Sequence, residues 1–408
     1  MWNLSSFGLL TAGLSLLTSQ ASAQVLHTSG RWIVDSNNAR VKLRCANWAG
    51  HMETKIPEGL QAQPVASIAK WIADNGFNCV RLTYSIDMAT NPSEPVSSAF
   101  TAAGESAGIA AADMTALYDS VVAKNSWISS ATTQSTFARV IDELAAHNVL
   151  VVLDNHVSHA SWCCGSSDGN GWWDQASGYN DANSRYFNTT AWLAGLAAMA
   201  EFSAAHPNVV GMALRNELRA TGSQDRDGHA DWRKFVGQGL NAIHGANPDL
   251  LMVVGGPSYA TDLSFLYSSP LDRSAYPDKV VWEFHNYQWS WSYSDCADHQ
   301  TKLGQKTGFL LSENQAYTGP LWLSEFGWNL DTPSAVEIDY YTCLVQYMQG
   351  NDADWAFWAL QGSYYIREGQ TNFEETFGLV NKDWSAWRNA SFPDILGSMF
   401  DVTQGPGI

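Results

Sequence analysis

The stretch VLVVLDNHV, residues 149–157, begins with five apolar residues in a row and turns polar at Asp154, Asn155 and His156. A strand with one exposed face alternates apolar and polar residues, whereas a strand buried on both faces is apolar throughout. The stretch therefore predicts a strand of a parallel sheet, with polar side chains at its carboxyl end.

Seven further apolar runs of this length recur along the chain. They are VKLRCANW (41–48), CVRLTYS (79–85), VVGMALRNE (209–217), LLMVVGGPS (250–258), VVWEFHNY (280–287), LWLSEFGW (321–328) and WAFWALQGS (355–363). Segments with helical spacing lie between them, at 64–76, 136–148, 191–206, 231–245 and 338–350, with weaker ones at 261–267 and near Phe309 and Ile395. This alternation predicts an α/β protein with a (β/α)8 TIM barrel.

A doubly wound open sheet is the main alternative to the barrel. No GxGxxG or GxxxxGKS/T motif follows a predicted strand, which argues against a nucleotide-binding fold. No linker rich in Pro, Ser or Thr divides the chain, so residues 24–408 are expected to form one domain. The stretch 97–134 is rich in Ala and Ser and weakly patterned, and we expect a long loop with some helix there.

The charge balance narrows the range of partners. The chain carries 40 Asp and Glu against 22 Lys and Arg, a formal net charge of −18. Such a chain repels polyanions, so neither nucleic acid nor an anionic membrane is an expected partner. The chain also has 19 Trp, and a flat indole can stack on the apolar face of a sugar ring, although many of these rings must be core.

The first residues have the pattern of a secretory signal peptide. An apolar stretch at 7–17 is followed by the small residues Ala21, Ser22 and Ala23, which predicts cleavage after Ala23. The apolar stretch is too short for a membrane-spanning helix, which needs about 20 residues. We therefore expect residues 1–23 to be removed and the protein to be secreted without a membrane anchor.

In a secreted protein, cysteines are expected to pair as disulfides, with the connectivity left open by the sequence. The six cysteines are Cys45, Cys79, Cys163, Cys164, Cys296 and Cys343. A metal site is the alternative, but the chain has no CxxC pair and two adjacent cysteines are poorly spaced as ligands. Asn188 and Asn389 begin sequons, so N-glycosylation is expected in a eukaryotic host.

Two glutamates stand at predicted strand ends, Glu217 and Glu325. The active site of a (β/α)8 barrel is built from the carboxyl ends of its strands. Glycoside hydrolysis needs two carboxyls there, one to protonate the leaving oxygen and one to attack the anomeric carbon or activate water. Metal-assisted hydrolysis is less well represented, because the chain has no HExxH motif and its strand-end histidines are few and scattered.

The strand ends together carry an ordered set of residues that resembles a known family. The set consists of Arg81 in VRLTYS, His156 in LDNHVS, Asn216-Glu217 in RNE, His285 and Tyr287 in FHNY, Glu325 in LSEFGW and Trp358 in FWALQG. In this order it resembles glycoside hydrolase family 5, the cellulase family of clan A, and CANWAGHMET (45–54) resembles the opening segment of that family. One departure is that the family usually has Asn-Glu-Pro, whereas Leu218 and Arg219 follow Glu217 here.

The resemblance implies a retaining double displacement. Glu217 would be the general acid/base, which needs a raised pKa, and Glu325 the nucleophile, which must stay ionised. Arg81 and Tyr287 would hold Glu325 charged and oriented. The alternative for Arg81 is an ion pair with a structural acid.

The resemblance also implies a set of substrate-binding residues. Asn216 would donate to the sugar 2-hydroxyl, and His156 and His285 would position sugar hydroxyls or the acid. Trp358 would form the floor of the subsite for the cleaved sugar, and we predict that Trp48 contributes to substrate binding as well. The alternative for the histidines and for Trp358 is a place in the core.

Further tryptophans in predicted loops are expected to divide between sugar subsites and packing. They are Trp162, Trp172, Trp173, Trp289, Trp291 and Trp328. Two adjacent cysteines and Asp168 lie within the segment SWCCGSSDGNGWW, 161–173. This segment resembles a loop of some cellulase-like members of the family from plants and fungi. We expect it to form one wall of the cleft, with a purely structural, disulfide-pinned loop as the alternative.

These observations predict a secreted retaining glycoside hydrolase that acts on a β-linked glucan, of the endo-β-1,4-glucanase type. Other specificities of the family are alternatives, namely β-mannan, β-1,3- or β-1,6-glucan and aryl or lipid β-glycosides, because loop shape selects the substrate on a shared fold. A non-catalytic carbohydrate-binding barrel is the alternative from another class, and the presence of both glutamates argues against it. No cofactor or metal is expected, because two carboxylates suffice. The protein is expected to be a monomer.

Overall fold

Eight parallel strands form a closed barrel in the computed structural model, which describes residues 25–408. The predicted signal peptide, residues 1–23, lies outside the described residues. The barrel order is β10-β3-β4-β5-β6-β7-β8-β9. The strands are β3 (Arg44–Trp48), β4 (Cys79–Ser85), β5 (Leu150–Val157), β6 (Val209–Ala213), β7 (Leu251–Gly255), β8 (Val280–His285), β9 (Leu321–Phe326) and β10 (Asp354–Phe357). All eight predicted runs thus contribute strands of the barrel. The alternative of a doubly wound open sheet is wrong.

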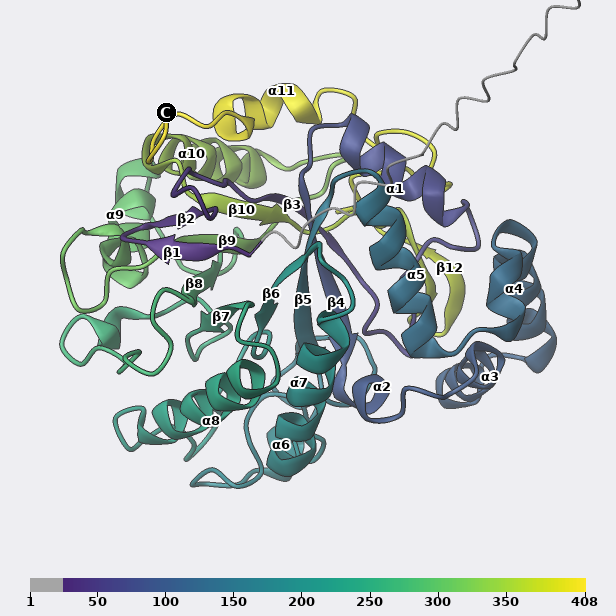
Figure 1. Ribbon diagram of the computed structural model, residues 1–408. Helices are drawn as coiled ribbons and strands as arrows, with labels where there is room; N and C mark the ends of the chain where they lie inside the picture. Colours follow the sequence, from purple (N-terminus) through teal and green to yellow (C-terminus); the bar gives the residue numbers. More distant parts are fainter. Residues whose placement is uncertain (1–24) are drawn as a thin grey trace, which may run out of the picture.

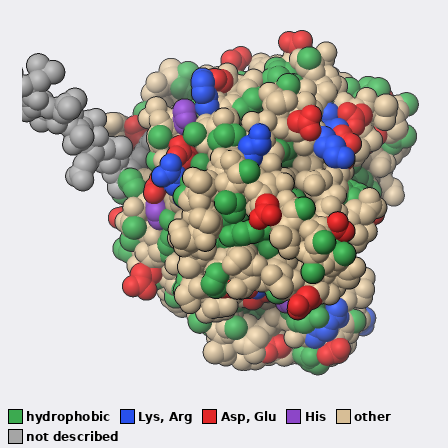
Figure 2. All heavy atoms as spheres, turned by 90° about the vertical axis from the view of Figure 1, so that its right-hand side faces the viewer, with side chains coloured by type: hydrophobic (Ala, Val, Ile, Leu, Met, Phe, Trp, Pro, Cys, Tyr) green, Lys and Arg blue, Asp and Glu red, His purple; other side chains and the backbone are tan. Residues whose placement is uncertain are grey.

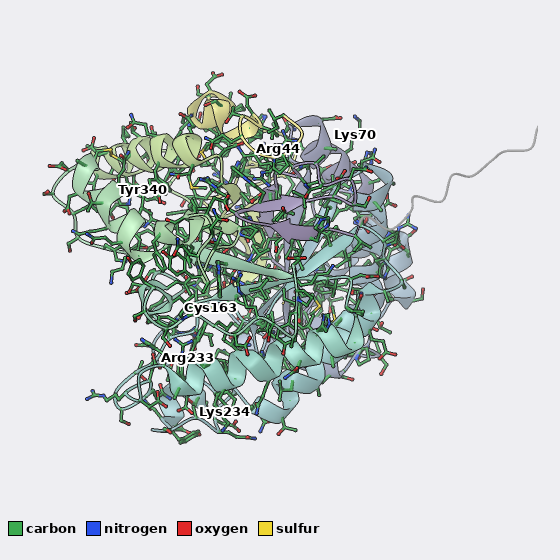
Figure 3. The ribbon with its side chains drawn as sticks, turned by 60° about the vertical axis from the view of Figure 1, so that its left-hand side comes forward. Arg44, Lys70, Cys163, Arg233, Lys234 and Tyr340 are labelled. Atoms are coloured by element: carbon green, nitrogen blue, oxygen red, sulfur yellow. A yellow bond between two sulfur atoms is a disulfide. The ribbon has the colours of Figure 1, made fainter. Side chains whose placement is uncertain are left out.

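Helices surround the barrel (Figure 1). Those that run between or after its strands are α1 (Val65–Asp74), α2 (Ile86–Thr90), α3 (Val96–Ala107), α4 (Ala111–Lys124), α5 (Thr133–Ala146), α6 (Asp181–Ser184), α7 (Thr189–Ser203), α8 (Ala230–Ala246), α9 (Cys296–Lys306), α10 (Ala335–Asn351) and α11 (Phe392–Leu396). Short 3-10 turns are η1 (Ser126–Ser130), η2 (Ser264–Leu266), η3 (Gly308–Leu311) and η4 (Gly397–Phe400). Figure 3 shows Arg233 and Lys234 on α8 and Tyr340 on α10, on opposite sides of the barrel.

Local sequence explains where helix α5 begins and which face it buries. Thr132 and Ser135 form a capping box, in which each side chain accepts a hydrogen bond from the other residue's backbone N–H. Phe137, Val140 and Ile141 then recur at helical spacing and are buried against the barrel. The helix is therefore fixed both at its first turn and along one face.

The core has two parts. One lies between the strands and the surrounding helices, and the other fills the inside of the barrel. An N-terminal antiparallel hairpin, β1 (His27–Ser29) with β2 (Trp32–Val34), lies across the barrel (Figure 1). Leu26 and Ile33 are fully buried there among the interior side chains. Apolar packing thus closes the amino-terminal end of the barrel, which leaves the carboxyl end for polar side chains.

The structure corrects one sequence-based expectation and adds two elements that were not predicted. The segment 97–134 is mostly helical, with α3, α4 and η1, because its Ala-rich composition has high helix propensity despite a weak apolar pattern. Helix α9 was not predicted, because it is polar and only His299 and Leu303 are buried. A second antiparallel hairpin, β11 (Ser363–Arg367) with β12 (Gln370–Glu374), was not predicted either. It follows β10 directly and stands beside the carboxyl end of the barrel.

The six cysteines pair as three disulfides, which confirms the prediction of an oxidised set. The bridges are Cys45–Cys79, Cys163–Cys164 and Cys296–Cys343. The first joins neighbouring residues of β3 and β4, and the third joins α9 to α10. The second closes between adjacent residues in the loop after β5.

We expect the double variant Cys45→Ala/Cys79→Ala to lose about 3–4 kcal/mol of unfolding free energy. The disulfide closes a loop of 34 residues and so lowers the conformational entropy of the unfolded chain. Guanidinium unfolding followed by tryptophan fluorescence measures this loss. A loss below about 1 kcal/mol would mean that barrel packing alone holds β3 to β4.

Charged side chains of both signs are scattered over the face that Figure 2 shows, without a single-sign patch. Within residues 25–408, no helix is long and apolar enough to cross a membrane.

Candidate active site

A cavity of about 910 Å³ opens at the carboxyl end of the barrel. Its lining includes seven of the nine predicted site residues, namely His156, Asn216, Glu217, His285, Tyr287, Glu325 and Trp358. Arg81 lies directly beneath it, fully buried. The strand ends that the sequence singled out therefore converge on one cleft, as expected for a (β/α)8 barrel.

Glu325 lies at the end of β9 and is held by two donors. Arg81 donates from Nη1 to its Oε1 at 2.7 Å, and the Tyr287 hydroxyl donates to its Oε2 at 3.1 Å. Burial raises the pKa of the Glu325 carboxyl, while the neighbouring His285 and Arg81 act to lower it. Burial of Arg81 disfavours its charge, but Asp154, Glu325 and Glu283 raise its pKa, so the guanidinium stays protonated.

Glu217 stands in the loop after β6, and its side chain is 14% exposed. Its Oε1 lies 2.9 Å from Nδ1 of His285. Burial raises the pKa of the Glu217 carboxyl to about 7, despite the opposing charges of Arg219 and Arg81. A carboxyl with such a pKa keeps its proton in about half of the molecules at pH 7 and in most of them below it, which is what proton donation requires.

The two carboxyl groups lie close together. One oxygen of Glu217, one oxygen of Glu325 and a ring nitrogen of His285 are all within 4.8 Å of one another. The strand register contributes to this, because it pairs His285 on β8 with Glu325 on β9. The environments of the two carboxyls differ, since Glu325 contacts a guanidinium directly whereas Glu217 faces an imidazole.

Four side chains form a closed ring of hydrogen bonds under the cleft. Arg81 Nη2 donates to Asp154 Oδ1 at 2.9 Å and to Asn216 Oδ1 at 2.8 Å. The Asn216 amide nitrogen lies 3.2 Å from Nε2 of His156, whose Nδ1 lies 2.6 Å from Asp154 Oδ2. An amide nitrogen only donates, so His156 Nε2 accepts and Nδ1 carries the proton.

This tautomer agrees with the electrostatics of the ring. Burial and the charge of Arg81 hold the pKa of His156 well below its usual range, so the ring is neutral. Arg81, which only donates, in turn fixes which way the Asn216 amide points. Each member of the ring thus orients the next, and Asn216 is presented to the cleft in one orientation.

The residues that replace the expected proline after Glu217 have a structural role. Leu218 is buried, and Arg219 holds the loop after β6 to the loop after β5. Arg219 Nη2 lies 2.6 Å from both carboxylate oxygens of Asp168, and its Nε donates to the Gly165 carbonyl at 2.9 Å. Its Nη1 donates to the carbonyl of Glu217 at 2.8 Å. Arg219 therefore ties Glu217 to the segment that contains the adjacent cysteines.

The Glu217 backbone is in the left-handed region, with φ of 42°. This conformation costs a residue with a side chain about 1–2 kcal/mol. The bond from Arg219 to the Glu217 carbonyl and the bond from the Asn216 N–H to the Asn155 carbonyl, at 2.8 Å, hold the backbone there. Such strain is maintained only where the surroundings fix it.

The predicted aromatic residues divide between cleft and core. Trp358 lines the cleft, and its ring stacks on His156 with 5.3 Å between centroids. The prediction for Trp48 is wrong, because its ring is fully buried, donates to the Glu58 carbonyl and packs near Trp384. Trp162 and Trp289 line the cleft, whereas Trp172, Trp173 and Trp328 are core and Trp291 packs against the core.

The sequence did not predict part of the cleft wall. The hairpin β11–β12 and the residues just after it contribute Arg367, Phe373 and Glu375, and the loop after β7 contributes Ser258 and Tyr259. The signal for the hairpin was Gly369, because the tight two-residue turn Glu368-Gly369 needs positive φ at both residues and both have it. The disulfide Cys163–Cys164 also lines the cleft, as expected of its loop, and Cys163 is labelled in the middle of Figure 3.

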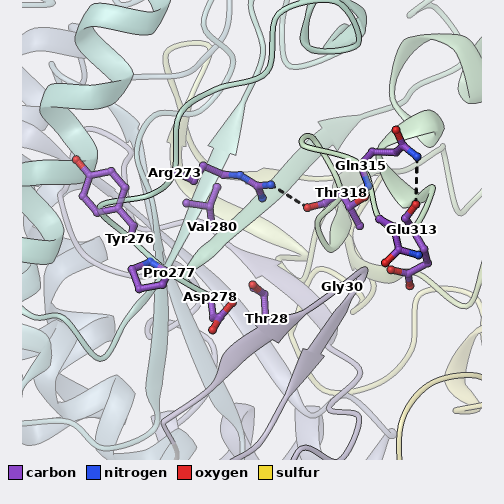
Figure 4. Close-up of a pocket in the computed structure, with 11 residues that line it drawn as sticks. Thr28, Gly30, Arg273, Tyr276, Pro277, Asp278, Val280, Glu313, Gln315 and Thr318 are labelled. Carbon is purple, nitrogen blue, oxygen red and sulfur yellow. Dashed lines mark hydrogen bonds between the residues drawn. The ribbon is translucent and has the colours of Figure 1, made fainter.

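Two groups of side chains among the described residues have the spacing of metal ligands. In the first, His156 with Cys163 and Cys164, both sulfurs are in a disulfide and are therefore not thiolate ligands. The second is Glu217 with His285 and Glu325, whose contacts suit proton transfer. A separate polar cavity of about 340 Å³ lies beside the N-terminal hairpin, lined by Thr28, Arg273 and Glu313 (Figure 4). It contains none of the predicted site residues.

Known proteins are similar to this chain in sequence and in fold. The model of the family described as cellulase (glycosyl hydrolase family 5) matches residues 34–363. A "Glycosyl hydrolase 5 family protein" of Chamaecyparis obtusa is 37% identical over 407 residues, covering 97% of this chain and 69% of the relative. An "Endoglucanase" of Paenibacillus polymyxa is 23% identical, covering 91% of this chain and 86% of the relative. The structure of a hyperthermophilic endocellulase from Pyrococcus horikoshii matches with a TM-score of 0.72 at 16% identity, covering 93% of this chain and 100% of that one.

Proposed function

The chain belongs to the cellulase family, glycosyl hydrolase family 5, and on this premise we propose that it is a secreted retaining hydrolase of β-1,4-linked glucan. As a member of that family it is a glycoside hydrolase with a carbohydrate substrate. The observation that carries the proposal is the pair Glu217 and Glu325, two carboxyls in one cleft with oxygens within 4.8 Å.

The separation of the carboxyls supports retention of configuration. Retaining enzymes hold the two groups about 5–5.5 Å apart, whereas inverting enzymes leave about 6.5–9.5 Å for a water molecule. The approach of Glu217 to Glu325 fits the shorter distance. One carboxylate then attacks the anomeric carbon and forms a glycosyl-enzyme, which water hydrolyses in a second step.

The surroundings of the carboxyls support their roles. Glu217, with a pKa raised to about 7, would donate its proton to the leaving oxygen and later take one from water. Glu325, held by Arg81 and Tyr287, would be the nucleophile. His285 lies between the two, 2.9 Å from Glu217 and 3.6 Å from Glu325, and would orient both.

The remaining assignments concern substrate binding. The ring of hydrogen bonds supports Asn216 as the donor to the sugar 2-hydroxyl and His156 as the residue that positions it. Trp358, which lines the cleft beside His156, would stack under the sugar that is attacked. Arg81 is fully buried beneath these residues, so we propose that it acts on the substrate through Glu325 and Asn216.

Secretion and processing belong to the same proposal. The predicted signal peptide at 1–23 and the three disulfides support an extracellular enzyme with one catalytic domain at 24–408. We extend the proposal to a monomer and, in a eukaryotic host, to glycans on Asn188 and Asn389. The names of the Paenibacillus and Pyrococcus relatives, endoglucanase and endocellulase, support β-1,4-glucan as the substrate and internal cleavage as the first expectation.

A substrate panel with stereochemical readout tests this function. We expect hydrolysis of β-1,4-glucan oligosaccharides, and proton NMR of the first product should show the β anomer before mutarotation, because two displacements restore the configuration. Mannan, β-1,3- and β-1,6-glucan and aryl β-glycosides are compared at equal enzyme concentration. An α anomer as the first product would contradict the retaining mechanism, and faster hydrolysis of another glycan would replace the substrate.

A further inference from the structure

Two loops from non-adjacent strands meet at one side of the cleft. The loop after β5 carries Trp162, and the hairpin β11–β12 after β10 carries Arg367. The Arg367 guanidinium carbon lies 3.6 Å from the centroid of the Trp162 ring. In barrel order, β3 and β4 lie between β10 and β5. The Arg367–Trp162 contact, which we call the bridge, therefore passes above the carboxyl ends of β3 and β4.

The bridge is held firmly on the hairpin side. Arg367 Nη1 donates to Glu375 Oε2 at 2.9 Å, and the Tyr364 hydroxyl donates to the same oxygen at 2.9 Å. Tyr364 also packs edge-on against Trp162, with 5.6 Å between ring centroids. The cation and both rings contact one another, which favours the closed arrangement.

The bridge is held on the other side by the loop of the adjacent cysteines. Trp162 directly precedes Cys163–Cys164, and Arg219 binds Gly165 and Asp168 a few residues further on. The loop is thus tied to the chain that carries Glu217. Neither half of the bridge is a free surface loop.

The space beneath the bridge is filled. Ala49, Met52 and Tyr364 form a small apolar cluster with exposed fractions of 0–1%, and Phe373 packs against it. A sugar chain therefore has no passage under the hairpin. The cleft is more open toward the loops after β7 and β8, where Tyr259 lines it and Trp289 is 64% exposed, against 36% for Trp162.

The proposed roles of the carboxyls say which end of the substrate faces the bridge. The nucleophile attacks the sugar on the glycone side, and the acid protonates the leaving group on the other side. Glu325 ends β9, the barrel neighbour of β10, and the hairpin that follows β10 begins just after Trp358. Glu217 follows β6 instead, next to the loop of Tyr259, whose N–H donates to the Leu218 carbonyl at 2.9 Å. The hairpin wall thus stands on the glycone side.

We infer that the bridge makes the glycone side of the cleft a blind end, which accepts only a short segment ending in a non-reducing terminus. This inference rests on the proposed roles of Glu217 and Glu325. It replaces the internal cleavage expected above with cleavage within a few sugars of the non-reducing end. Arg367 and Trp162 are then specificity-determining residues, and they bear on substrate length rather than on bond cleavage.

The test compares two oligosaccharides of equal length, five sugars, with a fluorescent label at the reducing end. One has a free non-reducing end, and the other carries a bulky 4,6-O-benzylidene cap there. Both are built on the glycan that the substrate panel identifies. We expect wild-type protein to cleave the capped substrate more slowly than the free one, by about tenfold or more, because a blind end has no room for the cap. The labelled product of the free substrate should be only one or two sugars shorter.

Variants of the bridge sharpen the comparison. In Arg367→Ala and Trp162→Ala the ratio of capped to free cleavage should rise about tenfold, because the blind end opens. Arg139→Ala on α5, which removes an exposed arginine paired with Glu143, is the matched control and should leave the ratio unchanged. Circular dichroism confirms that each variant is folded.

Each outcome separates the inference from the function it rests on. Equal cleavage of capped and free substrates by wild-type protein would overturn the blind end and leave the retaining mechanism intact, because both substrates would still be turned over. A rise in the ratio that is as large in Arg139→Ala as in the bridge variants would also overturn it. Loss of the β anomer in the substrate panel would contradict the proposed function independently of any ratio.

Discussion

Replacement of Glu325 with Gln is expected to lower turnover by a factor on the order of 10⁵, a loss similar to that caused by removing other covalent nucleophiles. The amide has almost the same shape as the carboxylate but does not attack an anomeric carbon. It still accepts a hydrogen bond from Arg81, which lies 2.7 Å from Oε1 in the native protein. The measurements are kcat on an aryl β-glycoside and the Kd of an oligosaccharide by calorimetry, with Kd expected to change little.

A control and a chemical rescue accompany this variant. Glu313→Gln makes the same carboxylate-to-amide change at the polar cavity beside the N-terminal hairpin, and it should leave kcat unchanged. Glu325→Gly should be rescued by azide, which enters from the face that the carboxylate vacates and yields the α-glycosyl azide. Activity of Glu325→Gln within about tenfold of wild type would remove Glu325 as the nucleophile.

The arrangement under the cleft explains why such a nucleophile is ready before substrate binds. Arg81 contacts Asp154, Glu325 and Asn216 at hydrogen-bond distance and lies 3.7 Å from Glu283. Several acids thus share one guanidinium, which keeps Arg81 charged and its position fixed. Groups that are fixed in advance need no reorganisation when charge develops in the transition state.

The strands and most of the site could be predicted from the sequence for a common reason. Each barrel strand is buried on both faces, so it is mostly apolar, and its polar residues gather toward its carboxyl end. Once the strands close into a barrel, these polar residues must converge, as Glu217, His285 and Glu325 do within 4.8 Å. The order of residues along the chain was therefore sufficient to predict where the two glutamates meet.

The rest could not be predicted because it depends on tertiary contacts. Trp48 ends β3 much as Trp358 directly follows β10, but Trp48 is enclosed by Trp384 and Glu58, which lie outside its strand. The contact of Arg367 with Trp162 joins positions 205 residues apart, and no local pattern reports it. The role of Arg219 could not be predicted either. The sequence shows it only as a departure from Asn-Glu-Pro, and its contact with Asp168 appears only in the fold.

The pH profile should report Glu217 on its alkaline side. Proton donation needs the protonated acid, and burial raises the pKa of Glu217 to about 7. Activity (kcat/KM) on an oligosaccharide should therefore fall above about pH 7, by about tenfold per pH unit. On the acid side, activity should fall as Glu325 gains a proton, at a pH above the ordinary range of a glutamate because burial raises its pKa. In Glu217→Gln the alkaline limb should disappear.

The size of the Glu217→Gln effect should depend on the leaving group. A sugar leaving group needs the proton, so oligosaccharide cleavage should fall by about 10²–10⁴-fold. A dinitrophenolate leaves without protonation, so the first step on a dinitrophenyl β-glycoside should be almost unchanged and the glycosyl-enzyme should accumulate, visible as a burst. Azide needs no general base, so it should restore turnover and give the β-glycosyl azide, the opposite anomer to that from Glu325→Gly. Equal losses on both substrates would assign Glu217 a structural role, because only a proton donor distinguishes one leaving group from the other.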